Sequence, residues 1–167
     1  MAELTQKERL QPSLLDRLTD DAPGERQESR EKRVLSVQKL RQSVLRDMSW
    51  LLNARSLESL LSLEQYPEVA KSVVNFGLKD LSGTTITGAD TSAIERRLKQ
   101  AIQNFEPRII PHSLKVTVTA AEDKMNHQAM SFDIEGELWA QPLPVHLYIR
   151  TEIDIETGDA SLRDLSG

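Results

Sequence analysis

The fold is decided by residues 130–138, Met-Ser-Phe-Asp-Ile-Glu-Gly-Glu-Leu, and by residues 145–155, Val-His-Leu-Tyr-Ile-Arg-Thr-Glu-Ile-Asp-Ile. Apolar and polar side chains alternate along both stretches, and the same alternation runs through residues 114–119. A period of two is typical of a strand with one buried and one polar face. The three stretches therefore predict an antiparallel sheet with one face covered by helices and the other in water or against a partner.

Helical patterns precede these strands. Apolar residues recur every three or four positions over residues 37–52, which predicts an amphipathic helix ending near Asn53. A second helix is predicted to begin at the capping-box pattern of Ser92 and Glu95. It must end just before Pro107, because proline disfavours helical geometry at the residue that precedes it. Helices first and strands later indicate an α+β domain, with two or three helices packed on one face of a mainly antiparallel sheet.

A short helix is predicted between these two. Pro67 suits the first turn of a helix, where its missing N–H costs no hydrogen bond. We expect Val69, Val73 and Val74 to face inward from this segment and Gly77 to stop it.

Residues 1–33 are predicted to form a flexible N-terminal docking arm with a charged linker, and residues 34–167 the folded domain. In the arm, Leu14, Leu15 and Leu18 fall at helical spacing. A helix this short is not stable alone, so its leucines must pack on their own domain or on a partner protein. The charged residues that follow cannot bury enough apolar surface to become ordered.

Composition excludes several classes of function. The chain has 167 residues, no cysteine and a net charge of −5 at pH 7. Thiol chemistry is therefore excluded, and the composition does not suggest the basic face that nucleic-acid binding requires. No apolar run is long enough to span a membrane, and residues 1–10 lack the apolar core of a signal peptide. We expect a cytoplasmic protein with no nucleic-acid partner and no direct membrane insertion.

No catalytic, metal or cofactor site is predicted. His112, His127 and His146 lack the spacing of metal ligands. A glycine-rich phosphate loop and the Gly-x-Ser-x-Gly nucleophile motif are also absent from the sequence.

Several motifs, in order, resemble those of one family. The motifs are Pro-Ser-Leu-Leu-Asp-Arg-Leu at residues 12–18, Arg-Asp-Met-Ser-Trp-Leu-Leu-Asn-Ala-Arg at residues 46–55, Tyr-Pro at residues 66–67, Ser-Val-Val-Asn-Phe-Gly-Leu-Lys-Asp-Leu-Ser-Gly at residues 72–83, and Phe-Glu-Pro-Arg-Ile at residues 105–109. Together they span nearly the whole chain. Through these motifs the chain resembles TssE, the baseplate subunit of type VI secretion systems, and is similar to the lysozyme-like wedge protein of contractile-tailed phages.

This resemblance implies a structural wedge subunit of a contractile injection machine. Family members contact other wedge subunits around the inner tube, which is a further candidate partner. Members of the family prime assembly of the sheath, and they resemble the sheath domain that links subunits by strand exchange. The tripeptide Glu106-Pro107-Arg108 is the family signature used in subunit contacts, so we expect it, with Leu14, Leu15 and Leu18, to bind partners.

The residues themselves allow two interpretations of the tripeptide. Pro107 forces a sharp exit from the helix, which would display Glu106 and Arg108 at a rigid corner, where the guanidinium can form a bidentate pair with a partner's carboxylate. Alternatively, Arg108 caps the helix or pairs with Glu106 inside the domain. Residues 145–155 likewise form either an edge strand open to strand addition or an interior strand of the core.

The lysozyme-like label of the family raises one alternative function, a peptidoglycan-cleaving hydrolase. Glycoside hydrolysis needs two carboxylates about 5 to 9.5 Å apart, one of them in apolar surroundings. Chance pairs are unavoidable among 26 acidic residues, and Glu135 and Glu137 share the polar face of one strand, as solvated residues do. Trp50 and Trp139 lie in different elements and form no sugar-binding cluster. We therefore expect no enzymatic activity.

Overall fold

A computed structural model describes residues 13–19, 24, 37–79, 88–119, 129–140, 143–154 and 156–166. Most of the predicted arm and linker therefore lies outside the described residues. The fold is α+β, as predicted, and the four strands within the described residues form one antiparallel sheet in the order β1-β2-β3-β4. The strands are β1 (Lys115–Thr119), β2 (Ala129–Leu138), β3 (Val145–Asp154) and β4 (Ala160–Asp164).

The position of β3 decides between the two interpretations of residues 145–155. This strand pairs with β2 on one side and with β4 on the other. Its residue Thr151 lies opposite Phe132 of β2 and opposite Leu162 of β4. The edge interpretation is therefore wrong for β3. Among the described strands, β1 and β4 lie at the edges.

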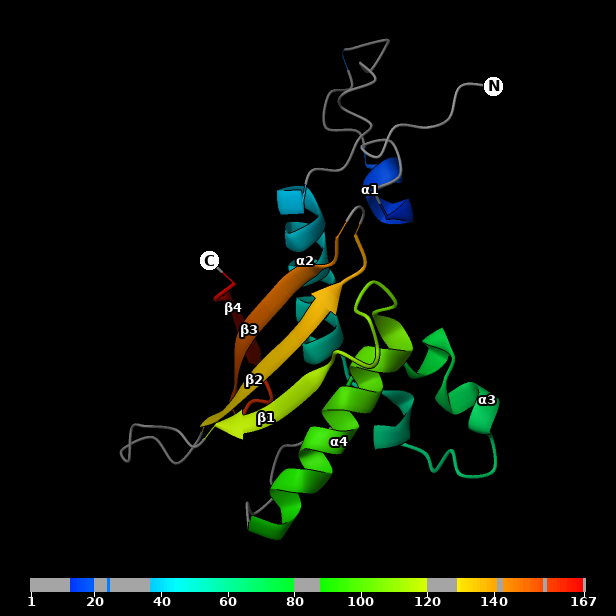
Figure 1. Cartoon of the computed structure of the whole chain (residues 1–167). Helices are drawn as coiled ribbons and strands as arrows, with labels where there is room; N and C mark the ends of the chain where they lie inside the picture. Colours follow the sequence, from blue (N-terminus) through cyan, green and yellow to red (C-terminus); the bar gives the residue numbers. More distant parts are fainter. Residues whose placement is uncertain are drawn as a thin grey trace.

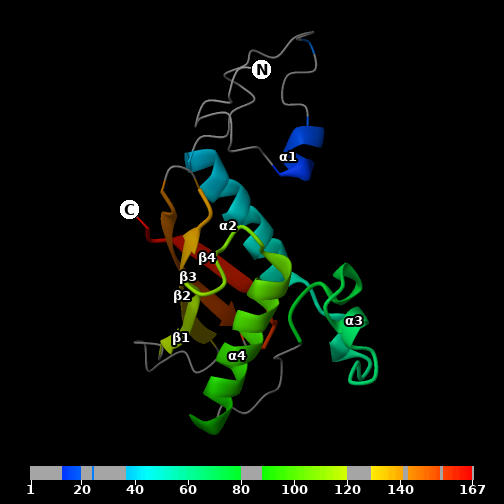
Figure 2. The ribbon, with the colours of Figure 1, turned by 45° about the vertical axis from the view of Figure 1, so that its right-hand side comes forward.

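Two long helices cover one face of this sheet (Figures 1 and 2). Helix α2 (Val37–Asn53) ends where the sequence predicts, and α4 (Gly88–Phe105) ends just before the proline. Helix α4 begins a turn earlier than predicted. Because its backbone is already helical from Gly88, Ser92 lies inside the helix and cannot cap it.

The core lies between these helices and the sheet. Its largest fully buried side chain is that of Phe132, and the alternation predicted for β2 and β3 is confirmed in the described residues of both strands. Among the described residues, the fully buried apolar side chains are Val44, Met48 and Leu51 of α2, Leu98 and Ile102 of α4, and Leu114, Phe132, Ile134, Leu138, Leu147 and Ile149 of the sheet and its approach. No described helix is both long enough and apolar enough to cross a membrane.

Residues 54–79 form a lobe between α2 and α4, built from η2 (Leu57–Ser59), α3 (Pro67–Ala70) and η3 (Val73–Asn75). Pro67 is the first helical residue of α3, as predicted. The inward placement of Val73 and Val74 is wrong, since they are 81% and 64% exposed. The short helix stops at Ala70, and a new turn capped by Ser72 carries both valines outward.

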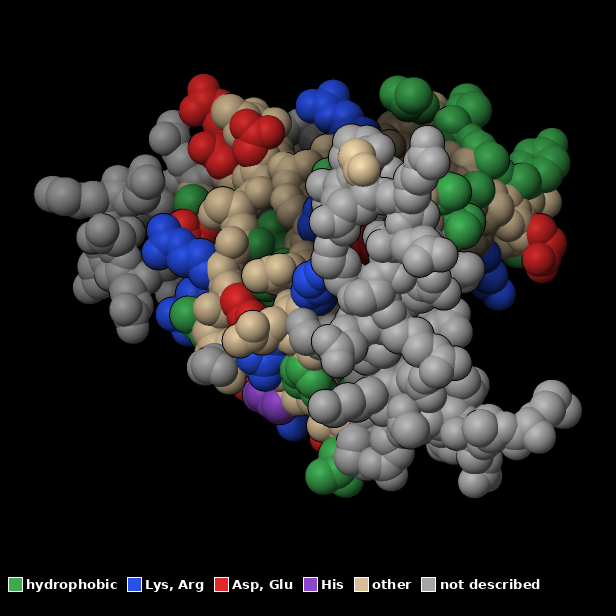
Figure 3. Space-filling model, turned by 90° about the horizontal axis from the view of Figure 1, so that it is seen from above, with side chains coloured by type: hydrophobic (Ala, Val, Ile, Leu, Met, Phe, Trp, Pro, Cys, Tyr) green, Lys and Arg blue, Asp and Glu red, His purple; other side chains and the backbone are tan. Residues whose placement is uncertain are grey.

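The two ends of the lobe are tied together. The Leu78 N–H donates to the Ala54 carbonyl at 2.8 Å, and the Ser56 N–H donates to the Leu78 carbonyl at 2.9 Å. Gly77, with φ of 123°, makes this approach possible, because a Cβ there would lie 2.4 Å from the Ala54 oxygen. The lobe also exposes Leu60, Leu61 and Tyr66. Figure 3 shows hydrophobic side chains gathered on the right of the view, the side on which α3 lies in Figure 1.

Candidate functional site

The Glu106-Pro107-Arg108 corner is fixed by backbone hydrogen bonds on both sides. Before the proline, the Glu106 N–H donates to the Ile102 carbonyl at 2.8 Å and completes the last turn of α4. After it, the Arg108 carbonyl accepts from the Trp139 N–H at 2.8 Å, and the Ile110 N–H donates to the Glu137 carbonyl at 2.8 Å. The chain therefore leaves the helix and joins the end of β2 without a loose segment.

Glu106 and Arg108 pair with each other at this corner. Arg108 Nε donates to Glu106 Oε1 at 2.7 Å, and Arg108 Nη2 lies 2.5 Å from Glu106 Oε2. Glu106 is only 3% exposed, so the prediction that both side chains are displayed at the corner is wrong for the carboxylate. The alternative, that Arg108 pairs with Glu106 inside the domain, is confirmed.

Arg108 also joins the corner to α2. Its Nη2 lies 2.6 Å from Asp47 Oδ2, and its Nη1 donates to Ser43 Oγ at 3.1 Å. Burial alone would lower the pKa of Arg108, but the hydrogen bonds and negative charges of Glu106 and Asp47 outweigh burial and raise that pKa above its ordinary value. The guanidinium thus remains charged and holds α4 against α2.

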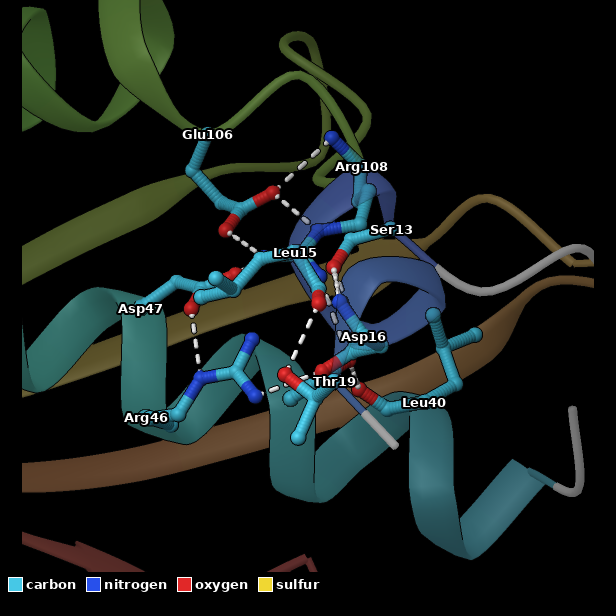
Figure 4. A network of polar contacts seen from close by, with 10 residues as sticks. Ser13, Leu15, Asp16, Thr19, Leu40, Arg46, Asp47, Glu106 and Arg108 are labelled. Carbon is cyan, nitrogen blue, oxygen red and sulfur yellow. Dashed lines mark hydrogen bonds and ion pairs between the residues drawn. The ribbon is translucent and has the colours of Figure 1, made fainter. Parts of the chain in front are cut away.

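The contacts continue from Asp47 to the N-terminal arm (Figure 4). Arg46 Nε lies 2.8 Å from Asp47 Oδ1, and Arg46 Nη1 lies 2.5 Å from Asp16 Oδ1. Asp16, Arg46, Asp47, Arg108 and Glu106 therefore form a row of alternating charge, which we call the charge row. With three carboxylates and two guanidinium groups it carries a net charge of −1.

Asp16 belongs to α1 (Leu14–Leu18), a single helical turn beside α2. Ser13 caps this turn by accepting from the Asp16 N–H at 3.3 Å. The three leucines predicted to bind partners are exposed, since Leu14, Leu15 and Leu18 are 70%, 43% and 75% accessible. The described part of the arm is therefore attached through a polar contact while its apolar side chains stay available.

An exposed aromatic ring lies beside the row. The Arg46 guanidinium lies 5.1 Å from the ring centroid of Trp50, and Trp50 is 52% exposed. A guanidinium at this distance is within the range of a cation–π contact.

Sequence reasoning missed three members of the row and the Ser43 contact. Arg46 and Asp47 stand in one of the family-like motifs and Asp16 in another. Nothing in the sequence shows that Asp16 contacts Arg46, 30 positions along the chain, or that Asp47 contacts Arg108, 61 positions along the chain. Only the packing of α1 and α4 against α2 brings these side chains together.

Three glutamates that could serve a hydrolase lie in surroundings unlike those of a protonated catalytic acid. Glu135 and Glu137 are exposed on the outer face of β2, and both oxygens of Glu106 accept from Arg108. In the described part of the chain, no group of three or more acidic or histidine side chains could hold a metal ion. His127 lies outside the described residues.

A family model described as baseplate wedge protein gp25 matches residues 38–143. The chain therefore belongs to the gp25 family of baseplate wedge proteins, which are structural subunits that assemble with other baseplate subunits. The resemblance found in the sequence is thus confirmed for the family.

One solved structure similar to this chain is a crystal structure of a "putative tail lysozyme" from Geobacter sulfurreducens. It is 21% identical, has a TM-score of 0.46, and the match covers 69% of this chain and 90% of that one. A search of the curated proteins finds no match.

Proposed function

We propose that this chain is a cytoplasmic wedge subunit of a type VI secretion baseplate, which acts by binding alone. It docks onto other wedge subunits through the Glu106-Pro107-Arg108 corner and through the arm of residues 1–33. Once docked, it primes assembly of the contractile sheath. The inner tube is a further candidate partner.

The charge row is the observation that supports this proposal most directly. It connects the corner at Arg108 to the arm at Asp16 through two residues of α2. The row therefore joins a rigid polar corner to a turn with three exposed leucines, with Trp50 beside it. Interfaces combine these elements, since aromatic and arginine side chains contribute most of the binding energy and apolar side chains exclude water around them.

Contact with sheath proteins is best supported at the edges of the sheet. Strands at an edge leave backbone N–H and C=O groups open to pairing with another chain. The edges belong to β1 and β4 among the described strands, so we assign strand addition to these rather than to β3.

Absence of catalysis is part of the proposal. A hydrolase of this class would need an acid held protonated in apolar surroundings. Glu106 is the one acidic residue among the described residues that is buried, and Arg108 binds both of its oxygens. Such a carboxylate serves as an ion-pair acceptor.

Co-expression with the other wedge subunits, followed by affinity purification, tests the docking role. The triple variant Leu14→Ser, Leu15→Ser, Leu18→Ser should retain the melting temperature of the parent chain, because these side chains are exposed. It should lose most of its co-purification, since each leucine buried at an interface contributes about 1.5–3 kcal/mol. Leu143→Ser with Leu165→Ser, also exposed, is the matched control and should co-purify normally. Undiminished co-purification of the triple variant would exclude the arm as a docking element.

A further inference from the structure

A groove lies between the lobe and α4, and no residue of the charge row lines it. It has a volume of about 450 Å³, and its apolar side chains include Leu78 of the lobe and Ile94, Leu98, Ala101 and Phe105 of α4. This volume falls within the range of about 300–1,000 Å³ that is usual for binding pockets. The groove can therefore hold several apolar side chains of a ligand.

The described charged residues that line the groove are mostly basic. Lys71 and Lys79 come from the lobe and Arg97 from α4, whereas Glu58 is the one acidic residue among the described lining residues. Lys71, Lys79 and Arg97 are exposed, and no ion pair joins any of them to a described residue. This local excess of positive charge contrasts with the net charge of −5 of the whole chain.

We propose that this groove binds a short amphipathic helix of another protein, whose apolar face enters the groove and whose flanking acidic residues meet Lys71, Lys79 and Arg97. An apolar channel with polar sides is the form in which proteins bind amphipathic helices. Complementary charge selects the sign of the flanking residues and speeds association. The inference does not depend on the proposed wedge function, because neither the corner nor the described residues of the arm line the groove.

A pair of synthetic peptides tests the inference on the full chain. Both carry leucines spaced three and four residues apart, one with glutamates at its two ends and the other with lysines there. Fluorescence anisotropy at low ionic strength should show the glutamate peptide binding at least about tenfold more tightly than the lysine peptide. Raising the salt concentration should reduce this difference.

Two charge reversals on α4 provide a matched comparison. Arg97→Glu should weaken binding of the glutamate peptide by about tenfold. Arg96→Glu changes the neighbouring exposed residue, which does not line the groove, and should leave binding within about twofold of the parent chain. Ala101→Arg should block both peptides, with circular dichroism confirming that the variants are folded.

Two results would overturn the inference. In the first, the chain binds the two peptides with equal affinity, and Arg97→Glu leaves both affinities unchanged. The other is a dimer of the parent chain in sedimentation velocity that Ala101→Arg dissociates, since a second copy would then be the occupant. A monomeric chain with the expected peptide preference would support it.

Discussion

The carboxylate of Glu106 and the guanidinium of Arg108 face each other across a single proline and form two contacts. Arg108 Nε lies 2.7 Å from Glu106 Oε1, and Arg108 Nη2 lies 2.5 Å from Glu106 Oε2. The backbone N–H of Arg108 donates to the same Oε1 at 3.1 Å. Glu106 is therefore surrounded by donors from a residue only two positions away. The tripeptide therefore closes its own turn and leaves only part of the arginine side chain exposed.

Arg108→Ala is expected to destabilise the isolated domain. Breaking a buried ion pair on one side costs about 3–5 kcal/mol, because the remaining charge stays buried without its partner. Since Arg108 retains 23% of its side-chain exposure, we expect a value near the lower end, about 3 kcal/mol. Urea unfolding measures it.

The double variant Glu106→Gln, Arg108→Met separates this effect from general loss of packing. It should be more stable than Arg108→Ala, because no buried charge remains unpaired. If the double variant is as unstable as Arg108→Ala alone, the unpaired carboxylate is not the cause.

Acid should release α1 from α2. Burial alone would raise the pKa of Asp16, but the hydrogen bonds from Arg46 and Ser13 outweigh it and lower that pKa overall. The charged carboxylate therefore stabilises the docked turn at every pH above the ordinary pKa of an aspartate. This contribution disappears as the pH falls through the lowered pKa.

Carboxyl chemical shifts followed by NMR through an acid titration measure this pKa directly. In Arg46→Gln the pKa of Asp16 should move up towards its ordinary value, while Arg163→Gln on β4 should leave it unchanged. An unchanged pKa in Arg46→Gln would show that the ion pair does not hold α1 in solution.

Gly77→Ala should displace the lobe. The new Cβ would meet the Ala54 carbonyl oxygen at 2.4 Å, and the backbone φ of 123° is unfavourable for alanine. We expect a loss of at least about 2 kcal/mol in the free energy of unfolding. Gly158→Ala is the control, because Gly158 also has a positive φ but nothing lies within 4 Å of its added Cβ. A similar loss in both variants would attribute the effect to backbone strain rather than to the contact with Ala54.

Peptidoglycan incubated with the purified chain should release no soluble fragments above background. Glu106→Gln and Glu135→Gln should behave like the parent chain, because neither carboxylate is placed to act as a catalytic acid. Turnover by the parent chain that Glu106→Gln abolishes would establish the hydrolase and contradict the proposed function.

The sheet and its core could be predicted from the sequence, because alternation assigns each residue of a strand to a face. Phe132 and Ile134 are buried for this reason. Strand β4 was not predictable in the same way. Its sequence, Ala-Ser-Leu-Arg-Asp, has little apolar alternation, and its conformation depends on pairing with β3.

The site was less predictable than the fold. The sequence identifies Glu106 and Arg108 through their motif, yet the choice between an exposed and an internal pair depends on where Asp47 lies. Asp47 approaches Arg108 only because α2 and α4 pack together. Contacts between distant segments leave no periodic pattern along a single sequence.

The alternating signs of the charge row have a consequence for how its sequence can change during evolution. Replacing one charge leaves its neighbour beside a like charge or an empty position, whereas a second replacement next to it can restore the pairing. We therefore expect positions 47 and 108, and likewise 16 and 46, to covary in pairs among homologues. Arms and domains from different lineages should then be interchangeable only where both halves of such a pair are inherited together.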